Sequence, residues 1–173
     1  MAARITSINV STKKGTRKTP LESGQVRVVA QRGCEDDAHA GDWHRQVSFL
    51  AEESIARARE LGLDVKEGDF AENFTTEDID LLDLPLGTVL GLGDEVEVMI
   101  SQIGKVCHTR CAIYRLAGDC IFPREGIFAV VLKGGTVHTG DLIAVIKRGE
   151  GVCPYSPQEA IDEVDAARAA GTL

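Results

Sequence analysis

The sequence predicts a mainly β fold, a closed or nearly closed β-barrel with a few peripheral helices. Six apolar, largely β-branched runs are typical of strands, whereas only two segments show helical periodicity. Gly-Asp and Gly-Gly pairs separate several of these runs and favour tight turns. Because strand-like and helical segments do not alternate along the chain, the sequence does not predict a doubly wound parallel sheet.

The predicted strands cover residues 3–10, 26–30, 46–50, 95–101, 127–132 and 142–146. The run from Glu95 to Ser101 alternates charged and apolar residues, as expected for a strand with one buried face. The run from Ile127 to Leu132 is continuously apolar, which is typical of a strand buried on both faces.

The first predicted helix runs from Glu52 to Leu61. Its apolar residues Ile55, Ala58 and Leu61 share one face, and Gly62 is placed to end it. The second predicted helix begins near the C-terminus of the sequence, where Ser156 is expected to be the N-cap of a capping box. Its apolar face contains Ala160, Ile161, Val164 and Ala167.

Composition places the chain among ordinary globular proteins, with 173 residues of which 43% are hydrophobic and 27% charged. We expect a barrel domain over residues 1–148 and a C-terminal extension with a short helix over residues 149–173. The formal net charge of -8 argues against nucleic-acid partners and anionic membranes, which both require a cationic surface. It does not exclude a local basic pocket for a small anion.

No apolar run approaches the roughly 20 residues that a membrane span requires. The first ten residues also lack the apolar core of a signal peptide, so we expect a cytoplasmic location. In such a reducing compartment the five cysteines are expected to be thiols, thiolates or metal ligands.

The segment 104–126 is the richest in chemical groups. It combines His108 with three cysteines and four cationic residues, which are Cys107, Cys111, Cys120, Lys105, Arg110, Arg115 and Arg124. Because a cation near a thiol favours the thiolate, this composition indicates a reactive cysteine or a bound anion. Alternatively, the three cysteines are small buried hydrophobic residues.

A zinc site is a further alternative for this segment, with Cys107, His108, Cys111 and Cys120 as ligands. The spacing of Cys107 and Cys111 is within the loose range of zinc pairs, but the sequence has no second pair. Adjacent Cys107 and His108 would also point to opposite faces of an extended segment.

Three other segments are candidates for a pocket. Residues 35–46 are dense in Asp and His, residues 68–79 contain an Asn beside a Glu, and residues 13–18 carry a run of cations. Each has a structural alternative, either a solvated loop or side chains that fix the local backbone. The commonest nucleotide-binding, zinc-protease and hydrolase motifs do not occur in the sequence.

The order of these segments resembles the MOSC domain, the module named after the C-terminal part of molybdenum cofactor sulfurases. The resemblance extends from about Thr19 to Ile146 and looks like the small stand-alone bacterial branch. It rests on five pieces in the family's order: Lys18–Pro20, His39 with His44–Ser48, Gly68–Phe74, Leu86–Asp94, and Cys107 with Gly134–Asp141. One departure is Ala71, where many members have Gly.

The resemblance implies a barrel of the MOSC and pyruvate-kinase type that takes part in molybdenum cofactor and sulfur handling. Cys107 stands where the family's cysteine is proposed to carry a persulfide or to bind molybdenum, and Cys111 or Cys120 would resolve the persulfide. The remaining residues would hold or shape the site of an anionic cofactor: Arg45, His39, Asn73, Lys105, His108, Arg110 and Arg124.

Three functions follow from this resemblance. The first is a sulfur carrier or molybdenum cofactor (molybdopterin) protein, with a cysteine desulfurase or cofactor biosynthesis and acceptor proteins as partners. The second is an enzyme that acts on a small substrate with the molybdenum cofactor or the thiolate alone. The third is a binding module with structural or zinc-bound cysteines. We do not expect pyridoxal phosphate, because the family's link to it comes from a desulfurase domain that this sequence lacks.

Overall fold

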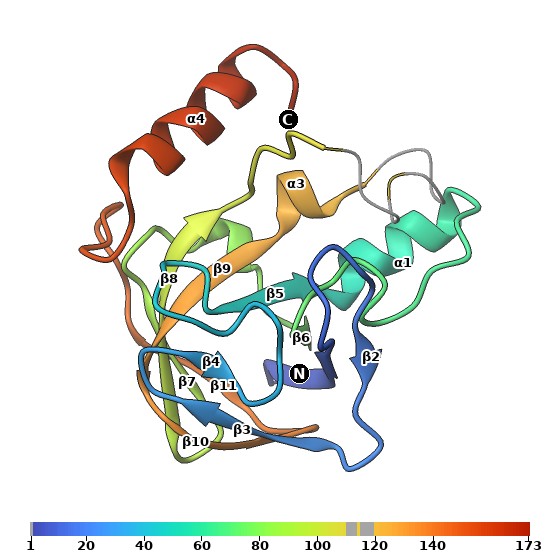
Figure 1. Ribbon diagram of the computed structural model, residues 1–173, viewed down its shortest axis with the longest axis vertical. Helices are drawn as coiled ribbons and strands as arrows, with labels where there is room; N and C mark the ends of the chain where they lie inside the picture. The colour runs from blue at the N-terminus through green and yellow to red at the C-terminus, as the bar shows by residue number, and fades with distance from the viewer. Residues whose placement is uncertain (1, 110–113, 115–119) are drawn as a thin grey trace.

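The strands of the computed structural model form two sheets, one large and one small (Figure 1). The structure describes residues 2–109, 114 and 120–173. Its strands are β1 (Arg4–Val10), β2 (Thr19–Pro20), β3 (Gln25–Val29), β4 (Gly33–Cys34), β5 (Val47–Ala51), β6 (Phe74–Glu77), β7 (Val89–Leu92), β8 (Val96–Ile103), β9 (Ile127–Lys133), β10 (Gly135–His138) and β11 (Ile143–Lys147). The mainly β prediction is therefore confirmed.

The large sheet is mixed and has eight strands in the order β11-β7-β8-β9-β5-β6-β1-β2. Only β5 and β6 run parallel among these described pairs, and the helix between them makes the crossover. The ladder does not close into a continuous barrel within the described residues. Near its two ends, a single bridge joins Arg4 to Leu142, and the N–H of Ile5 donates to the carbonyl of Asp141 at 3.0 Å.

The small sheet, β10-β3-β4, covers part of the interior of the large one. Residues of both sheets form one aliphatic core, because Val26, Val28 and Val137 of the small sheet pack with Ile100 and Val131 of the large sheet. This core uses the alternate positions of β8 that the sequence predicted to be buried.

Within the described ranges, three α-helices lie toward one end of the molecule, away from β3 and β10 (Figure 1). They are α1 (Glu52–Glu60), α3 (Phe122–Glu125) and α4 (Gln158–Ala169), and a 3-10 turn spans Leu81–Asp83. As predicted, Ile55 and Ala58 are buried on α1, and Gly62 follows its end with a positive φ of 89°. The prediction for Leu61 is wrong, because it is the C-cap of the helix and is 82% exposed.

The predicted capping box of the C-terminal helix is wrong. The N-cap of α4 is Pro157, and no side chain caps it. The hydroxyl of Ser156 instead donates to the carbonyl of Ser101 in β8, so it attaches the extension to the sheet. The predicted apolar face is correct, since Val164 is buried and its three partners are the least exposed of the remaining positions.

The C-terminal segment is held on the large sheet by further contacts. The guanidinium of Arg168 donates to the carbonyl of Ile103 at 2.9 Å, and the N–H of Gly151 donates to the carbonyl of Leu86 at 3.1 Å. The chain consequently ends beside the segment that follows β8 (Figure 1). Among the described residues, no helix has the length and apolar character needed to cross a membrane.

Candidate functional site

A pocket of about 310 Å³ lies where four loops of the large sheet meet. We call it the cationic pocket, because Lys14, Arg45 and Lys105 contribute to its walls. The other lining residues are His39, Trp43, Ser48, Ala71, Asn73, Phe122 and Phe128. The cationic run 13–18 and the cysteine-rich segment, which are far apart in sequence, thus meet at one cavity.

Arg45 is the most constrained cation of this pocket. Its guanidinium carbon is 4.7 Å from the ring centre of Trp43 and 5.5 Å from that of Phe128. Burial lowers the pKa of Arg45, while the electrostatic influence of Cys107 and Glu163 acts in the opposite direction. An arginine remains charged in proteins, so Arg45 supplies a fixed positive charge within electrostatic range of the Cys107 sulfur.

Asn73 joins the pocket to the frame of the sheet. Its Oδ1 accepts hydrogen bonds from the backbone N–H and the hydroxyl of Ser48 at 3.1 and 3.2 Å. Its Nδ2 donates to the carbonyl of Asn9 at 3.2 Å. Asn73 therefore holds β1, β5 and β6 together beneath the pocket, in agreement with the structural alternative for this segment.

Glu72 is fully buried behind Asn73 and accepts hydrogen bonds from the N–H of Gly68 and the hydroxyl of Thr75. Burial raises the pKa of Glu72 to about 7 despite these hydrogen bonds. Its other oxygen, Oε2, has no hydrogen-bond partner among the described residues.

A buried ion pair supports the loop that carries His39. The Nζ atom of Lys18 is 2.7 Å from both carboxylate oxygens of Asp37, and both side chains are inaccessible to solvent. Asp37 also accepts from the backbone N–H groups of Ser11 and His39 at 3.1 and 3.0 Å. The sequence made this acidic segment a pocket candidate with a solvated loop as the alternative, and its pattern does not show that Asp37 is buried against Lys18.

A second pocket, of about 290 Å³, adjoins the cationic pocket on the side of α4. We call it the Cys107 pocket. Cys107 is exposed, whereas Cys120 in the same lining is buried. The remaining lining residues are Val106, Thr109, Tyr114, Pro123, Arg124, Ala167, Thr172 and Leu173.

The predicted site residues therefore divide between two neighbouring cavities. His39, Arg45, Asn73 and Lys105 line the cationic pocket, and Cys107, Cys120 and Arg124 line the Cys107 pocket. His108 lines neither, and its Nε2 is 2.9 Å from a carboxylate oxygen of Glu163 on α4. Arg110 and Cys111 lie outside the described residues.

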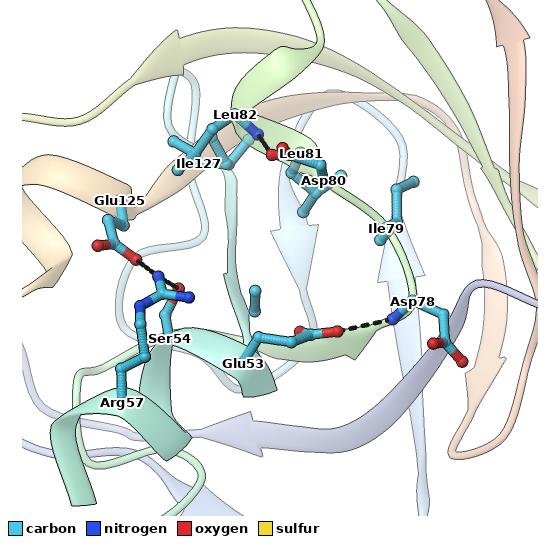
Figure 2. A pocket seen from close by; sticks show the side chains of 11 residues that line it. Glu53, Ser54, Arg57, Asp78, Ile79, Asp80, Leu81, Leu82, Glu125 and Ile127 are labelled. Atoms are coloured by element: carbon cyan, nitrogen blue, oxygen red, sulfur yellow. Dashed lines mark hydrogen bonds and ion pairs between the residues drawn. The ribbon is translucent and has the colours of Figure 1, made fainter. Parts of the chain in front are cut away.

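A third pocket, of about 410 Å³, lies beside α1 and contains none of the predicted site residues (Figure 2). The guanidinium of Arg57 bonds to Glu125 at 2.8 Å and to Ser54 at 3.1 Å, and Glu53 accepts from the N–H of Asp78 at 3.0 Å. These groups bond to one another across the cavity, so they join α1 to neighbouring loops.

Within the described ranges, no three His, Cys, Asp or Glu side chains are grouped to hold a metal ion. The four-ligand zinc set includes Cys111 and so lies partly outside those ranges. Sequence analysis also missed the aromatic residues Phe122 and Phe128 as pocket walls. Phe128 belongs to a buried apolar strand, and nothing in the sequence pattern distinguishes a strand residue that borders a cavity from one within the core.

Comparison with known proteins identifies a match to the model of the MOSC domain over residues 36–144. No curated protein matches the chain. Among solved structures, YiiM from Geobacillus stearothermophilus is 21% identical, with a TM-score of 0.66 over 96% of this chain and 83% of that one. YiiM from Escherichia coli is 17% identical, with a TM-score of 0.64 over 96% and 77% of the two chains.

The YuaD protein of Bacillus subtilis is 16% identical, with a TM-score of 0.67 over 83% of this chain and 94% of that one. At these identities the structural likeness establishes a shared fold.

Proposed function

The chain belongs to the MOSC domain family, and from this membership we propose that it handles sulfur or binds the molybdenum cofactor through Cys107. The observation that carries the proposal is the exposed thiol of Cys107, which lines a pocket beside the segment that brings Lys105 into the cationic pocket. A fixed positive charge stabilises a thiolate, which is the form that attacks sulfur and binds metals.

As a sulfur carrier, the Cys107 thiolate would attack the outer sulfur of a persulfide on a donor such as a cysteine desulfurase. A new S–S bond forms at Cys107, the donor's S–S bond breaks, and its electron pair leaves with the donor thiolate. Cys120 lines the same pocket and is one candidate to resolve the persulfide, and Cys111 is the other.

The donor groups also fit an anionic pterin cofactor. Lys14, Arg45 and Lys105 suit a phosphate group, the pocket's aromatic residues suit a flat ring system, and a thiolate is a soft ligand suited to molybdenum. When bound, the cofactor would supply redox and sulfur chemistry at the metal. The chain's residues would bind the phosphate, orient the ring and present Cys107, with cofactor biosynthesis or acceptor proteins as partners.

The test is an intact-mass and metal analysis of protein purified without added thiols. Wild type is compared with Cys107→Ser and with the matched control Cys153→Ser, which changes a buried cysteine outside both pockets. One additional sulfur on wild type and on the control, absent from Cys107→Ser, supports sulfur carriage. Molybdenum with the same dependence supports a cofactor ligand.

An unmodified mass with no molybdenum, after incubation with a cysteine desulfurase and its substrate, contradicts the carrier function. Stoichiometric zinc that resists mild chelation would instead indicate a binding module with structural cysteines.

A further inference from the structure

The buried pair of Lys18 and Asp37 joins two loops that carry walls of the cationic pocket. Charges removed from water are stable only when they are paired and hydrogen-bonded, and the four contacts of Asp37 described above satisfy this condition. Burial alone would raise the pKa of Asp37, but the neighbouring imidazole and backbone N–H of His39 and the charge of Lys18 hold it well below its usual range. The pair therefore places a fixed carboxylate directly behind His39.

The imidazole of His39 has one buried and one accessible side. Its Nδ1 is inaccessible, has no hydrogen-bond partner among the described residues, and is 3.6 Å from Oδ1 of Asp37. The side chain is 29% exposed, and the residue lines the cationic pocket, so the accessible part of the ring is the part away from Nδ1.

A neutral imidazole carries its proton on only one of its two nitrogens. A proton on Nδ1 would face the negative Oδ1 of Asp37, and a shift of a few tenths of an ångström would make a hydrogen bond. A lone pair on Nδ1 would instead face that same negative oxygen in a buried environment, which is unfavourable. The geometry therefore favours one tautomer.

We propose that Asp37 is a positioning residue that keeps the proton of neutral His39 on Nδ1 and so presents an unprotonated Nε2 to the cationic pocket. The inference rests on the proposed function, because it assigns a role to His39 within the pocket that would hold the anionic ligand. Lys18 acts through Asp37, since its Nζ atom is 2.7 Å from both carboxylate oxygens and so fixes the carboxylate beside the imidazole.

This arrangement restricts the chemistry of the ligand. Lys14, Arg45 and Lys105 line the same pocket as His39 and suit an anionic group, while an unprotonated Nε2 is a hydrogen-bond acceptor. The pocket then fits a molecule that carries an anionic group together with an N–H, O–H or S–H donor. A ligand with acceptors alone would leave Nε2 without a partner.

The test is a long-range ¹H–¹⁵N correlation spectrum of protein labelled at histidine, without any ligand, about two pH units above the ordinary histidine pKa of roughly 6.5. Two other histidines are internal references. His138 is exposed, and its Nδ1 is also 3.6 Å from a carboxylate oxygen. It therefore shows the signals of an imidazole whose two tautomers exchange in solvent at the same distance from a carboxylate. His44, whose Nε2 is 2.7 Å from Oε1 of Gln102, should show the opposite tautomer.

We expect wild-type His39 to show a protonated Nδ1 and an unprotonated Nε2. In Asp37→Asn the negative charge beside Nδ1 is lost, so the preference for a proton on Nδ1 falls and the tautomer shifts toward Nε2–H. Asp36→Asn removes the same charge from an exposed neighbouring residue and should leave the His39 signals unchanged.

Two results for wild type would overturn the proposal: an Nε2–H tautomer of His39, or His39 signals averaged like those of His138. Identical His39 signals in wild type and in folded Asp37→Asn would also overturn it. Since Asp37→Asn leaves Lys18 buried without a countercharge, the double variant Lys18→Met with Asp37→Asn gives a second test of the same shift. Failure of the proposed function is distinguished because this measurement uses neither Cys107 nor a cofactor.

Discussion

Cys107 differs from Cys34, Cys120 and Cys153 in being the exposed cysteine of the described set. Burial raises the pKa of Cys34 to about 12, which keeps that thiol protonated and unreactive. We expect iodoacetamide at neutral pH to alkylate Cys107 at least ~10-fold faster than Cys34 or Cys153. Peptide mass spectrometry over time measures the three rates, and equal rates in urea are the control. Comparable rates in the folded protein would contradict the reactive-cysteine assignment.

Glu72 makes stability depend on pH in a direction opposite to that of most carboxylates. Its pKa in the folded protein is raised to about 7, so its stabilising contribution is present below the unfolded-state pKa and is lost as pH rises through about 7. We expect Glu72→Gln to become more stable relative to wild type by roughly 2–3 kcal/mol between pH 4.5 and pH 8.

Urea unfolding at several pH values measures this difference. Glu22→Gln, which changes an exposed carboxylate, is the control and should follow wild type at each pH. A constant difference between Glu72→Gln and wild type across this range would exclude the raised pKa.

Ala71 adopts a left-handed backbone conformation, with a φ of 69°. That conformation costs an alanine about 1–2 kcal/mol, whereas glycine adopts it freely. The greater entropy of glycine in the unfolded chain lowers the stability of the folded state by roughly 0.5–1 kcal/mol. We therefore expect Ala71→Gly to raise the free energy of unfolding by ~0.5–1 kcal/mol. Ala144→Gly in strand β11 is the matched control and should lower it. This backbone geometry also explains why a glycine suits the position that sequence analysis marked as a departure.

Some residues of the candidate site could be predicted from the sequence, and others could not. Cations beside cysteines indicated a basic site near Cys107, and Lys14 with Lys105 now line one pocket. The pairing of Lys18 with Asp37 could not be predicted, because ion pairs between distant loops leave no periodicity in the sequence. Glu72 and Asn73 were recognised as a candidate pair, but their burial depends on the packing of three strands.

At the level of elements, periodicity identified the long strands and the two longer helices. The six predicted strands correspond to β1, β3, β5, β8, β9 and β11. Strands β2, β4, β6, β7 and β10 were missed, since they contain two to four residues each and too few positions to show alternation. The cap of α4 was misassigned because Ser156 bonds to β8, a tertiary contact that overrides local preference.

The helix α4 is anchored by a single buried side chain among its described residues, Val164. Truncation of a buried valine leaves a small cavity, so we expect Val164→Ala to lower the free energy of unfolding by about 1–2 kcal/mol. The matched control is Val152→Ala, which changes a valine that is 72% exposed and should have an effect within about 0.5 kcal/mol. Thermal unfolding measures both variants, and equal effects would mean that α4 is not packed through Val164.

At the scale of the whole molecule, a chain with a net charge of -8 gathers three cations around one cavity. The acidic composition did not exclude such a local basic site. The site forms because the sheet brings residues 14, 45 and 105 together. The mainly β class followed from the sequence. The incomplete ladder between β1 and β11 could not be predicted from the sequence, because the pairing of these strands depends on the curvature of the whole sheet.

The segment that follows β8 separates the two pockets, with Lys105 in the wall of one and Cys107 in the wall of the other. We expect a ligand that shifts this segment from one side to change the affinity for a ligand on the other side, and such an effect on binding is reciprocal. We expect inorganic phosphate to change the alkylation rate of Cys107, and Cys107 alkylation to change the affinity for phosphate. The filling of one pocket would thereby alter the reactivity in the other.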